Sequence, residues 1–232
     1  MYRVADLILR IPDLGDMPDR LSHYETSAKE PVDIDIDAVD LRPSRWKTLD
    51  GNQQYYMETG WVFYKKLLSF NGMMLHASAV AKDGYGYLFS GPCGMGKSTH
   101  ARMYLQAFGE QAQIINDDKP AIRRVGDIWY VYGTPWCGKD GININQKVRL
   151  SGICFLRRGD TRIRRLSPKE SVQYILAQTQ HKLEREDMIK LLKTVDSLAR
   201  EIPMFELFSH AELGDAQLSY SEMSNAVREM EI

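Results

Sequence analysis

The chain has 232 residues, of which 44% are hydrophobic and 26% are charged, and its formal net charge is −1 at pH 7. This composition excludes a disordered chain, and the length is sufficient for one large hydrophobic core. The nearly neutral charge gives no global argument for binding nucleic acid or an anionic membrane surface. The best candidate for a membrane span, WVFYKKLLSF, is interrupted by two lysines, so we expect no membrane partner.

The N-terminus and the cysteines indicate a cellular compartment. The stretch MYRVADLILRIPD carries charges among its apolar residues, which does not fit a signal peptide. Cys93, Cys137 and Cys154 are odd in number and lack metal-ligand spacing, a pattern typical of free thiols in a reducing compartment. We therefore expect a cytoplasmic protein. Because the net charge is close to zero, we expect no nucleic-acid partner.

Residues 1–71 are expected to form a segment of strands and helix that packs on a main domain of residues 72–232. Within this segment, VDIDIDA (residues 32–38) alternates apolar and acidic residues, which predicts a half-buried strand. Its D-x-D-x-D spacing also suggests a calcium loop, but Ala38 stands where such a loop needs glycine, so a solvated acidic face is preferred. Residues 54–70 have apolar positions at helical spacing and predict a helix.

The remaining chain mixes strands and helices. Strands are expected at 72–80, 85–91, 112–116 and near 203–208, a hairpin at 121–133 and strands within 147–166, a helix at 97–108 closed by Gly109, and helices from 168 onward. Because β-α-β alternation is not strict, we expect an α/β domain with a central mixed, partly antiparallel sheet and a C-terminal helical segment. The apolar stripe of residues 184–200 would be core or the face of a homo-oligomer.

A glycine-rich motif, GPCGMGKS, lies between the strand expected at 85–91 and the helix expected at 97–108. It matches G-x-x-x-x-G-K-[ST], in which glycines let successive N–H groups converge on phosphate at a helix N-terminus. In this motif Lys97 reaches the β- and γ-phosphates of ATP, and Ser98 is a ligand of Mg²⁺. The predicted nucleotide-binding residues are Gly91, Pro92, Cys93, Gly94, Met95, Gly96, Lys97, Ser98 and Thr99.

Two acidic residues, Asp117 and Asp118, end the next buried strand. A carboxylate at such a position is where a second anchor for magnesium is expected, so we place Asp117 with Ser98 among the metal ligands. Because adjacent strand residues point to opposite faces, one carboxylate would hold the hydrated metal and the other would act as a base towards an acceptor hydroxyl. Which of the two is the base stays open, and a solvated strand end is the competing interpretation.

The stretches LHASAVAKDGYGYLFSGPCGMGKST and IINDDKPAI, in this order, resemble the catalytic domain of HPr kinase/phosphorylase and its smaller relatives in the phosphoenolpyruvate-carboxykinase-like P-loop group. The resemblance covers about residues 72–160. It implies a P-loop fold, the cofactors ATP and Mg²⁺, metal and base roles for Asp117 and Asp118, and a place for His76 near the transferred phosphoryl group. The segment before His76 is shorter than the separate N-terminal domain of that enzyme, so the implied acceptor is not restricted to HPr.

The predicted activity is transfer of the γ-phosphoryl group of ATP to a hydroxyl, on a serine of a peptide or protein or on a small metabolite. A non-catalytic ATP-binding switch is the alternative. The loop GTPWCGKDG (residues 133–141) follows the Asp-bearing strand and its hairpin, so Trp136 and Lys139 are expected on the acceptor side, as a stacking surface and a phosphate partner. A packed Trp136 and a solvated Lys139 describe the loop equally well. The arginine-rich stretch 156–166 would contact an acidic partner or present a solvated face.

Overall fold

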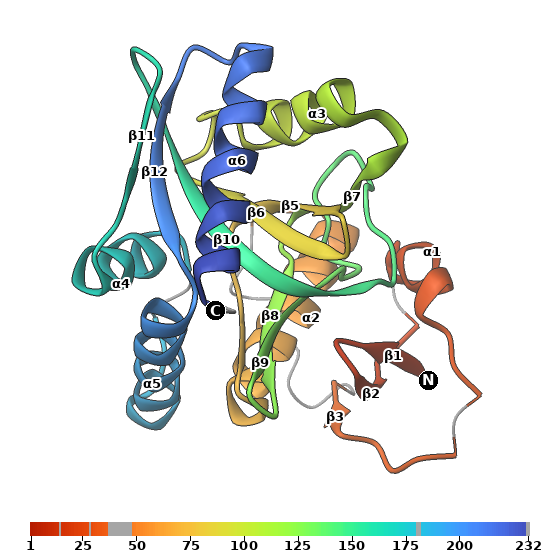
Figure 1. The fold of residues 1–232 in the computed structure, drawn as a ribbon. Helices are drawn as coiled ribbons and strands as arrows, with labels where there is room; N and C mark the ends of the chain where they lie inside the picture. Colours follow the sequence, from red (N-terminus) through yellow and green to blue (C-terminus); the bar gives the residue numbers. More distant parts are fainter. Residues whose placement is uncertain (14, 28, 37–47, 180–181, 231–232) are drawn as a thin grey trace.

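The computed structural model describes residues 1–13, 15–27, 29–36, 48–179 and 182–230 (Figure 1). Its N-terminal part contains β1 (Tyr2–Val4), β2 (Leu7–Arg10), α1 (Met17–Leu21), β3 (Ile34–Asp35) and α2 (Gly51–Leu67). The first three strands form a small sheet in the order β1-β2-β3. The predicted helix at 54–70 is confirmed as α2 and the short 3-10 helix Leu68–Phe70 that extends it. It begins at Asp50, whose side chain accepts a hydrogen bond from the N–H of Gln53 and caps the helix.

The strand predicted at 32–38 is confirmed for Ile34–Asp35, and residues 37 and 38 lie outside the described residues. Its acidic side chains lie on the solvent side, as expected, since Asp33 is exposed and Asp35 is half-buried whereas Ile34 and Ile36 are buried. Asp33 accepts a hydrogen bond of 2.8 Å from the N–H of Ile8, and Asp35 pairs with Arg10 at 2.9 Å. Both carboxylates therefore stabilise the pairing of β3 with β2.

In the described part of the chain, nine strands form the large sheet. They are β4 (Gly72–Met74), β5 (Ala77–Lys82), β6 (Tyr85–Ser90), β7 (Ala112–Asp118), β8 (Ala121–Val125), β9 (Ile128–Tyr132), β10 (Lys147–Arg158), β11 (Arg162–Arg165) and β12 (Met204–Ser209). Seven of these strands lie in the order β4-β8-β9-β10-β6-β5-β7. In addition, β12 pairs with β10, and β11 pairs with β12. β10 runs parallel to β6 and β12 but antiparallel to β9. The sheet is thus mixed and partly antiparallel, which confirms the predicted fold class.

The stretch 72–80, predicted as one strand, is divided into β4 and β5 at Leu75 and His76. β4 pairs with β8, whereas β5 pairs with β6 and β7, so the chain changes its partner strand at this point. The N–H of Leu75 donates to the carbonyl of Pro120, and that of His76 donates to the carbonyl of Gln178. Because these N–H groups are used outside the sheet ladder, the strand is interrupted at His76.

Helices cover the sheet on more than one side. α3 (Lys97–Phe108) packs against α6 (Leu213–Met230), and α4 (Pro168–Ala177) packs against α5 (Arg185–Glu201). Figure 1 shows α4 and α5 on the side of the molecule opposite to β1, β2 and β3. The bounds predicted for α3 are confirmed, and Gly109 follows it with φ 54°. The predicted C-terminal helices and the strand near 203–208 are also present.

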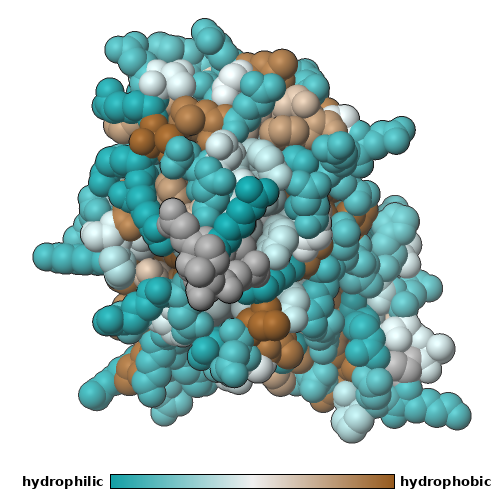
Figure 2. All heavy atoms as spheres, viewed as in Figure 1, coloured by the Kyte–Doolittle hydropathy of each residue, from teal (hydrophilic) through white to brown (hydrophobic). Residues whose placement is uncertain are grey.

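A single hydrophobic cluster joins residues of both parts of the chain, among them Tyr24, Phe63, Trp136, Ile153 and Val195. The segment 1–71 therefore packs through apolar contacts on the large sheet, while the domain boundary at residue 71 stays a prediction. On the face shown in Figure 2, hydrophilic residues predominate and hydrophobic side chains form separate patches. Across the described ranges, no helix combines the length and the apolar character needed to span a membrane.

Candidate active site

The glycine-rich motif forms a tight loop between β6 and α3. β6 ends at Ser90 and α3 begins at Lys97. Gly94 and Gly96 have φ of 75° and 93°, in the left-handed region that residues with a side chain rarely adopt. Gly96 occupies the N-cap of α3, so the N-terminal N–H groups of that helix lie at the loop. This geometry is the one that the phosphate-binding interpretation requires.

Lys97 lies across the loop. Its Nζ donates hydrogen bonds to the carbonyls of Gly91 at 3.0 Å and Pro92 at 3.1 Å. Burial is the main cause that lowers the pKa of Lys97. The Lys97 ammonium is held by neutral carbonyls in a partly buried loop, so it is not fully hydrated. Less water competes with an anionic oxygen for this cation, which favours binding of the anion.

The other residues of the loop differ in exposure. Pro92, Cys93, Gly94 and Thr99 are exposed, and Met95 is half-buried. Arg158, expected only as one arginine of the 156–166 stretch, donates a hydrogen bond of 3.0 Å from Nη2 to the carbonyl of Gly94. Arg158 ends β10 and adds a second cation beside the glycine loop.

The other arginines of the 156–166 stretch have partners within the protein. Arg157 and Arg164 both pair with Glu206, at 3.3 and 2.9 Å, and Arg162 lies over the ring of Phe208. These contacts stabilise the β11–β12 edge of the sheet. They favour neither of the two interpretations considered for the stretch as a whole, an acidic partner or a simple solvated face.

Asp117 joins β7 to the glycine loop. Its Oδ1 accepts a hydrogen bond of 3.0 Å from Oγ of Ser98, so the predicted pair of metal ligands lies together. The same oxygen accepts a short hydrogen bond from Oγ of Ser78, which stands opposite Asp117 in the β5–β7 ladder. Both Ser78 and Asp117 are buried. Ser78 could have been found from the sequence only with knowledge of this strand register.

Asp118 faces a different set of groups. Its Oδ1 lies 3.0 Å from Nζ of Lys119 and 3.5 Å from Nε2 of His76. The backbone of Asp118 has φ 145°, a conformation that costs a residue with a side chain about 1–3 kcal/mol. Asn116 helps to hold it, since its Oδ1 accepts a hydrogen bond of 2.9 Å from the N–H of Lys119. Strained backbone of this kind is often found at functional sites.

His76 connects Asp118 with the end of β6. Its carbonyl accepts a hydrogen bond of 2.9 Å from Oγ of Ser90, the residue before the glycine loop. Burial, together with the positive charges of Lys119 and Lys97, lowers the pKa of His76 to about 4 against the opposing effect of the two aspartates. The imidazole is therefore neutral at pH 7.

Residues 134–137, in the loop after β9, are buried against the rest of the protein. Trp136 is buried and stacks on Phe63 with ring centroids 4.6 Å apart, so its indole packs against helix α2. Oγ1 of Thr134 donates to the carbonyl of Lys119 at 2.7 Å. The loop reaches the aspartates through Gly138, where a Cβ atom would lie 3.2 Å from Cβ of Asp118.

Lys139, the other residue predicted on the acceptor side, is exposed. The structure brings Trp136 to the wall of a cavity beside His76, whereas Lys139 is not among the residues that line it.

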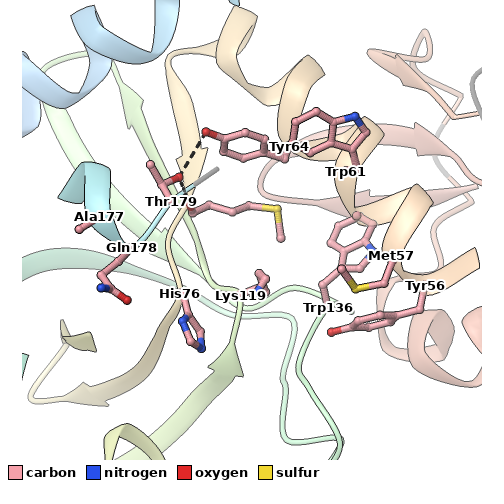
Figure 3. A pocket seen from close by; sticks show the side chains of 12 residues that line it. Tyr56, Met57, Trp61, Tyr64, His76, Lys119, Trp136, Ala177, Gln178 and Thr179 are labelled. Carbon is pink, nitrogen blue, oxygen red and sulfur yellow. Dashed lines mark hydrogen bonds between the residues drawn. The ribbon is translucent and has the colours of Figure 1, made fainter. Parts of the chain in front are cut away.

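This cavity has a volume of about 250 Å³ and lies between α2, residues 133–138 and the C-terminal end of α4 (Figure 3). Figure 3 shows His76 and Lys119 at one edge of the cavity, with the aromatic rings of Tyr56, Trp61 and Trp136 on one side and Gln178 and Thr179 on the other. The lining side chains come from elements far apart in the sequence, and they include Tyr56, Met57, Trp61, Tyr64, Met74, Trp136, Gln178 and Thr179.

The oxygen groups near the loop fit a nucleotide-bound Mg²⁺. Within the described residues there is no cluster of three or more His, Cys, Asp or Glu side chains suited to hold a metal ion without substrate. Asp117 and Ser98 instead offer one carboxylate and one hydroxyl. Mg²⁺ commonly keeps several waters and binds through one or two carboxylates together with substrate phosphates. A sparse set of oxygen donors beside the glycine loop matches that preference.

Comparison with known proteins found similarity only at the level of solved structures. No family model matches the sequence, and no curated protein matches it. Among solved structures, the chain is similar to the Hpr(Ser) kinase/phosphatase from Coxiella burnetii, over 68% of this chain and 93% of that chain, with 13% identity and a TM-score of 0.41. Likeness at this level assigns neither a family nor an activity, so the function proposed below rests on the geometry of the site.

Proposed function

We propose that the protein is an ATP-dependent kinase that transfers the γ-phosphoryl group to a hydroxyl with the help of Mg²⁺. The hydrogen bond of 3.0 Å between Ser98 and Asp117 is the main support, because it joins the glycine loop to the acidic end of β7. A phosphate-binding loop, a metal-binding carboxylate and a second carboxylate are the parts that phosphoryl transfer requires.

The glycine loop and its cations bind the phosphates. The N-terminal N–H groups of α3 and the ammonium of Lys97 attract phosphate oxygens, and Arg158 adds positive charge beside Gly94. Ser98 and Asp117 would hold Mg²⁺, which supplies neutralisation of the charge on the β- and γ-phosphates.

Asp118 is the residue we assign as the base, because Asp117 already accepts hydrogen bonds from two serines. The oxygen of the acceptor hydroxyl forms a bond to the γ-phosphorus, and its proton passes to the carboxylate of Asp118. The bond between the γ-phosphorus and the β,γ-bridging oxygen breaks, and its electron pair leaves with ADP. Lys119 and the neutral His76 contact the Asp118 carboxylate and orient it towards the acceptor.

The experiment that tests this function does not need the natural acceptor. Mg²⁺-dependent hydrolysis of ATP, with water as the acceptor, is measured for the wild type and for Asp118→Asn, together with the affinity for ATP. We expect hydrolysis to fall about 100-fold or more in the variant, since a general base contributes about 10²–10⁴. The affinity for ATP is expected to stay unchanged.

A different result would favour the non-catalytic switch. Tight binding of ATP by the wild type, with no hydrolysis and no transfer to any acceptor tested, would contradict a kinase. Equal hydrolysis by the wild type and by Asp118→Asn would contradict the role assigned to Asp118.

A further inference from the structure

The cavity beside α2 opens next to the groups that surround Asp118. His76 and Lys119 line its inner end, and both lie near the Asp118 carboxylate, at 3.5 and 3.0 Å. His76 is in turn tied to Ser90 at the start of the glycine loop. A group in the cavity would therefore lie next to Asp118 and near the start of the glycine loop.

The walls of the cavity are aromatic. Tyr56, Trp61 and Tyr64 project from α2, and Trp136 faces them from the loop (Figure 3). Trp61 and Tyr64 have ring centroids 5.9 Å apart, and Trp136 is held by its stack on Phe63. Rigid aromatic walls of this kind bind apolar and aromatic groups well, because they bury large areas at little cost in entropy.

A glycine in the middle of α2 shapes one wall. Glycine destabilises a helix interior by about 0.5–1 kcal/mol relative to alanine. At Gly60, however, a Cβ atom would lie 2.8 Å from Cδ1 of Trp136, so alanine would displace the indole. The close approach of Trp136 to α2, which defines this side of the cavity, thus depends on Gly60.

Size and charge restrict what the cavity can hold. Its volume of about 250 Å³ is just below the range of roughly 300–1,000 Å³ that is usual for pockets of drug-sized ligands. It therefore suits one ring or one large side chain rather than a nucleoside. Lys119 is the charged residue in the lining, and it already pairs with Asp118, so a strongly anionic group would gain little here.

We infer that this cavity binds the phosphate acceptor, which inserts one aromatic or large apolar group between α2 and Trp136. The accepting hydroxyl is carried on this group or next to it, and points to Asp118. The inference deepens the proposed function and depends on it. The same chemistry is found in an aromatic side chain of a peptide and in a small aromatic alcohol.

Binding of the acceptor group is tested without turnover, by NMR of the indole N–H signals of Trp61 and Trp136. The probes are 2-phenylethanol and p-cresol, with glycerol as the polar control. We expect saturable shifts of both signals with the aromatic probes and none with glycerol. In Trp61→Ala the affinity for the aromatic probes should fall about tenfold or more, whereas Trp61→Phe should restore most of it. Tyr130→Ala, on β9 outside the cavity, is the matched control and should bind as the wild type does.

Transfer assays identify the source of the group. Labelled ATP and Mg²⁺ are supplied with 2-phenylethanol, p-cresol, a peptide with serine beside phenylalanine, or the same peptide with alanine for phenylalanine. Labelling of either kind of aromatic acceptor supports the inference. Labelling of both peptides to the same extent above background, labelling of none of the four acceptors, or no shift of the indole signals overturns it. If Lys97→Ala bound ATP normally while the aromatic probes still shifted the signals, the proposed function would fail and the cavity would remain a binding site.

Discussion

Ser98 and Asp117 are joined by a hydrogen bond of 3.0 Å although they lie 19 residues apart on different elements. Ser98 is in the first turn of α3, and Asp117 is in β7. The two elements are brought together because β7 pairs with β5, which in turn pairs with β6, the strand that leads into the glycine loop. The fold therefore places a carboxylate beside the first turn of α3, where we propose that phosphate binds.

The first prediction concerns Lys97. Wild-type protein should unfold at a higher temperature in the presence of ATP and Mg²⁺, because a ligand at 100 times its Kd stabilises the folded state by about 2.7 kcal/mol. Lys97→Ala should lose most of this shift, since its ammonium lies inside the loop at the carbonyls of Gly91 and Pro92. Differential scanning fluorimetry checks the result, with Lys169→Ala, an exposed lysine on α4, as the control. An equal shift in both variants would contradict the phosphate loop.

The second prediction concerns the strained backbone of Asp118. With φ 145°, this residue adopts a conformation that glycine reaches without strain but alanine does not. Asp118→Gly should therefore have a free energy of unfolding at least about 1 kcal/mol larger than Asp118→Ala. Both variants lose the same carboxylate and its ion pair with Lys119, so their difference isolates the backbone. Urea unfolding measures it, and equal stability of the two variants would limit the strain to the roughly 0.5–1 kcal/mol by which the greater freedom of glycine in the unfolded chain opposes the gain.

The third prediction concerns pH. In the unfolded chain the pKa of a histidine is about 6.5, whereas burial lowers the pKa of His76 to about 4. Between these values the unfolded state binds a proton that the folded state does not, so the free energy of unfolding falls as the pH falls from 6.5 to 4. His76→Gln should lose less stability over this window.

The same variant isolates His76 from other groups. Burial also lowers the pKa of His100 to about 4, and this residue is present in both proteins, so it cancels in the comparison. Urea unfolding gives the difference in the free energy of unfolding between wild type and His76→Gln, once at pH 7 and once at pH 4.5. A stability difference between wild type and His76→Gln that did not change with pH would contradict the lowered pKa, as would an NMR titration of His76 with a midpoint near 6.5.

Local patterns predicted the parts of the site that depend on neighbouring residues in the chain. The glycine loop and the bounds of α3 follow from a motif and a helix signal that need no tertiary information. The end of β7 at Asp118 was placed in the same way, from an apolar run followed by acidic residues. What these patterns could not give was the side-chain partner of each carboxylate.

The partners depend on strand register and on long-range packing. Ser78 contacts Asp117 because the two residues stand opposite each other across β5 and β7, a pairing that a single sequence does not reveal. The interruption of the predicted strand at His76 arises because its two halves pair with different strands. The cavity was missed for the same reason, since α2, the 133–138 loop and the end of α4 meet only in the folded chain.

The last prediction concerns Trp136 and Lys139, which the sequence placed together on the acceptor side. The structure separates them, because the indole is buried against Phe63 and donates from Nε1 to Oγ1 of Thr59 at 3.3 Å, whereas Lys139 is exposed. Trp136→Ala should therefore destabilise the protein by about 3–5 kcal/mol, as expected for removal of a large buried ring. Trp136→Phe should retain most of the stability, since a ring still stacks on Phe63.

Acceptor kinetics then separate packing from substrate binding. If Trp136 lines the acceptor cavity, Trp136→Phe should raise the KM for an aromatic acceptor while the Kd for ATP stays at the wild-type value. Lys139→Ala should change stability by less than about 0.5 kcal/mol, because substitutions at exposed positions without packed neighbours have small effects. Chemical unfolding, calorimetric titration with ATP and steady-state kinetics on the same four proteins provide the comparison. Equal losses of ATP affinity and acceptor affinity in Trp136→Phe would place the indole in general packing rather than in recognition of the acceptor.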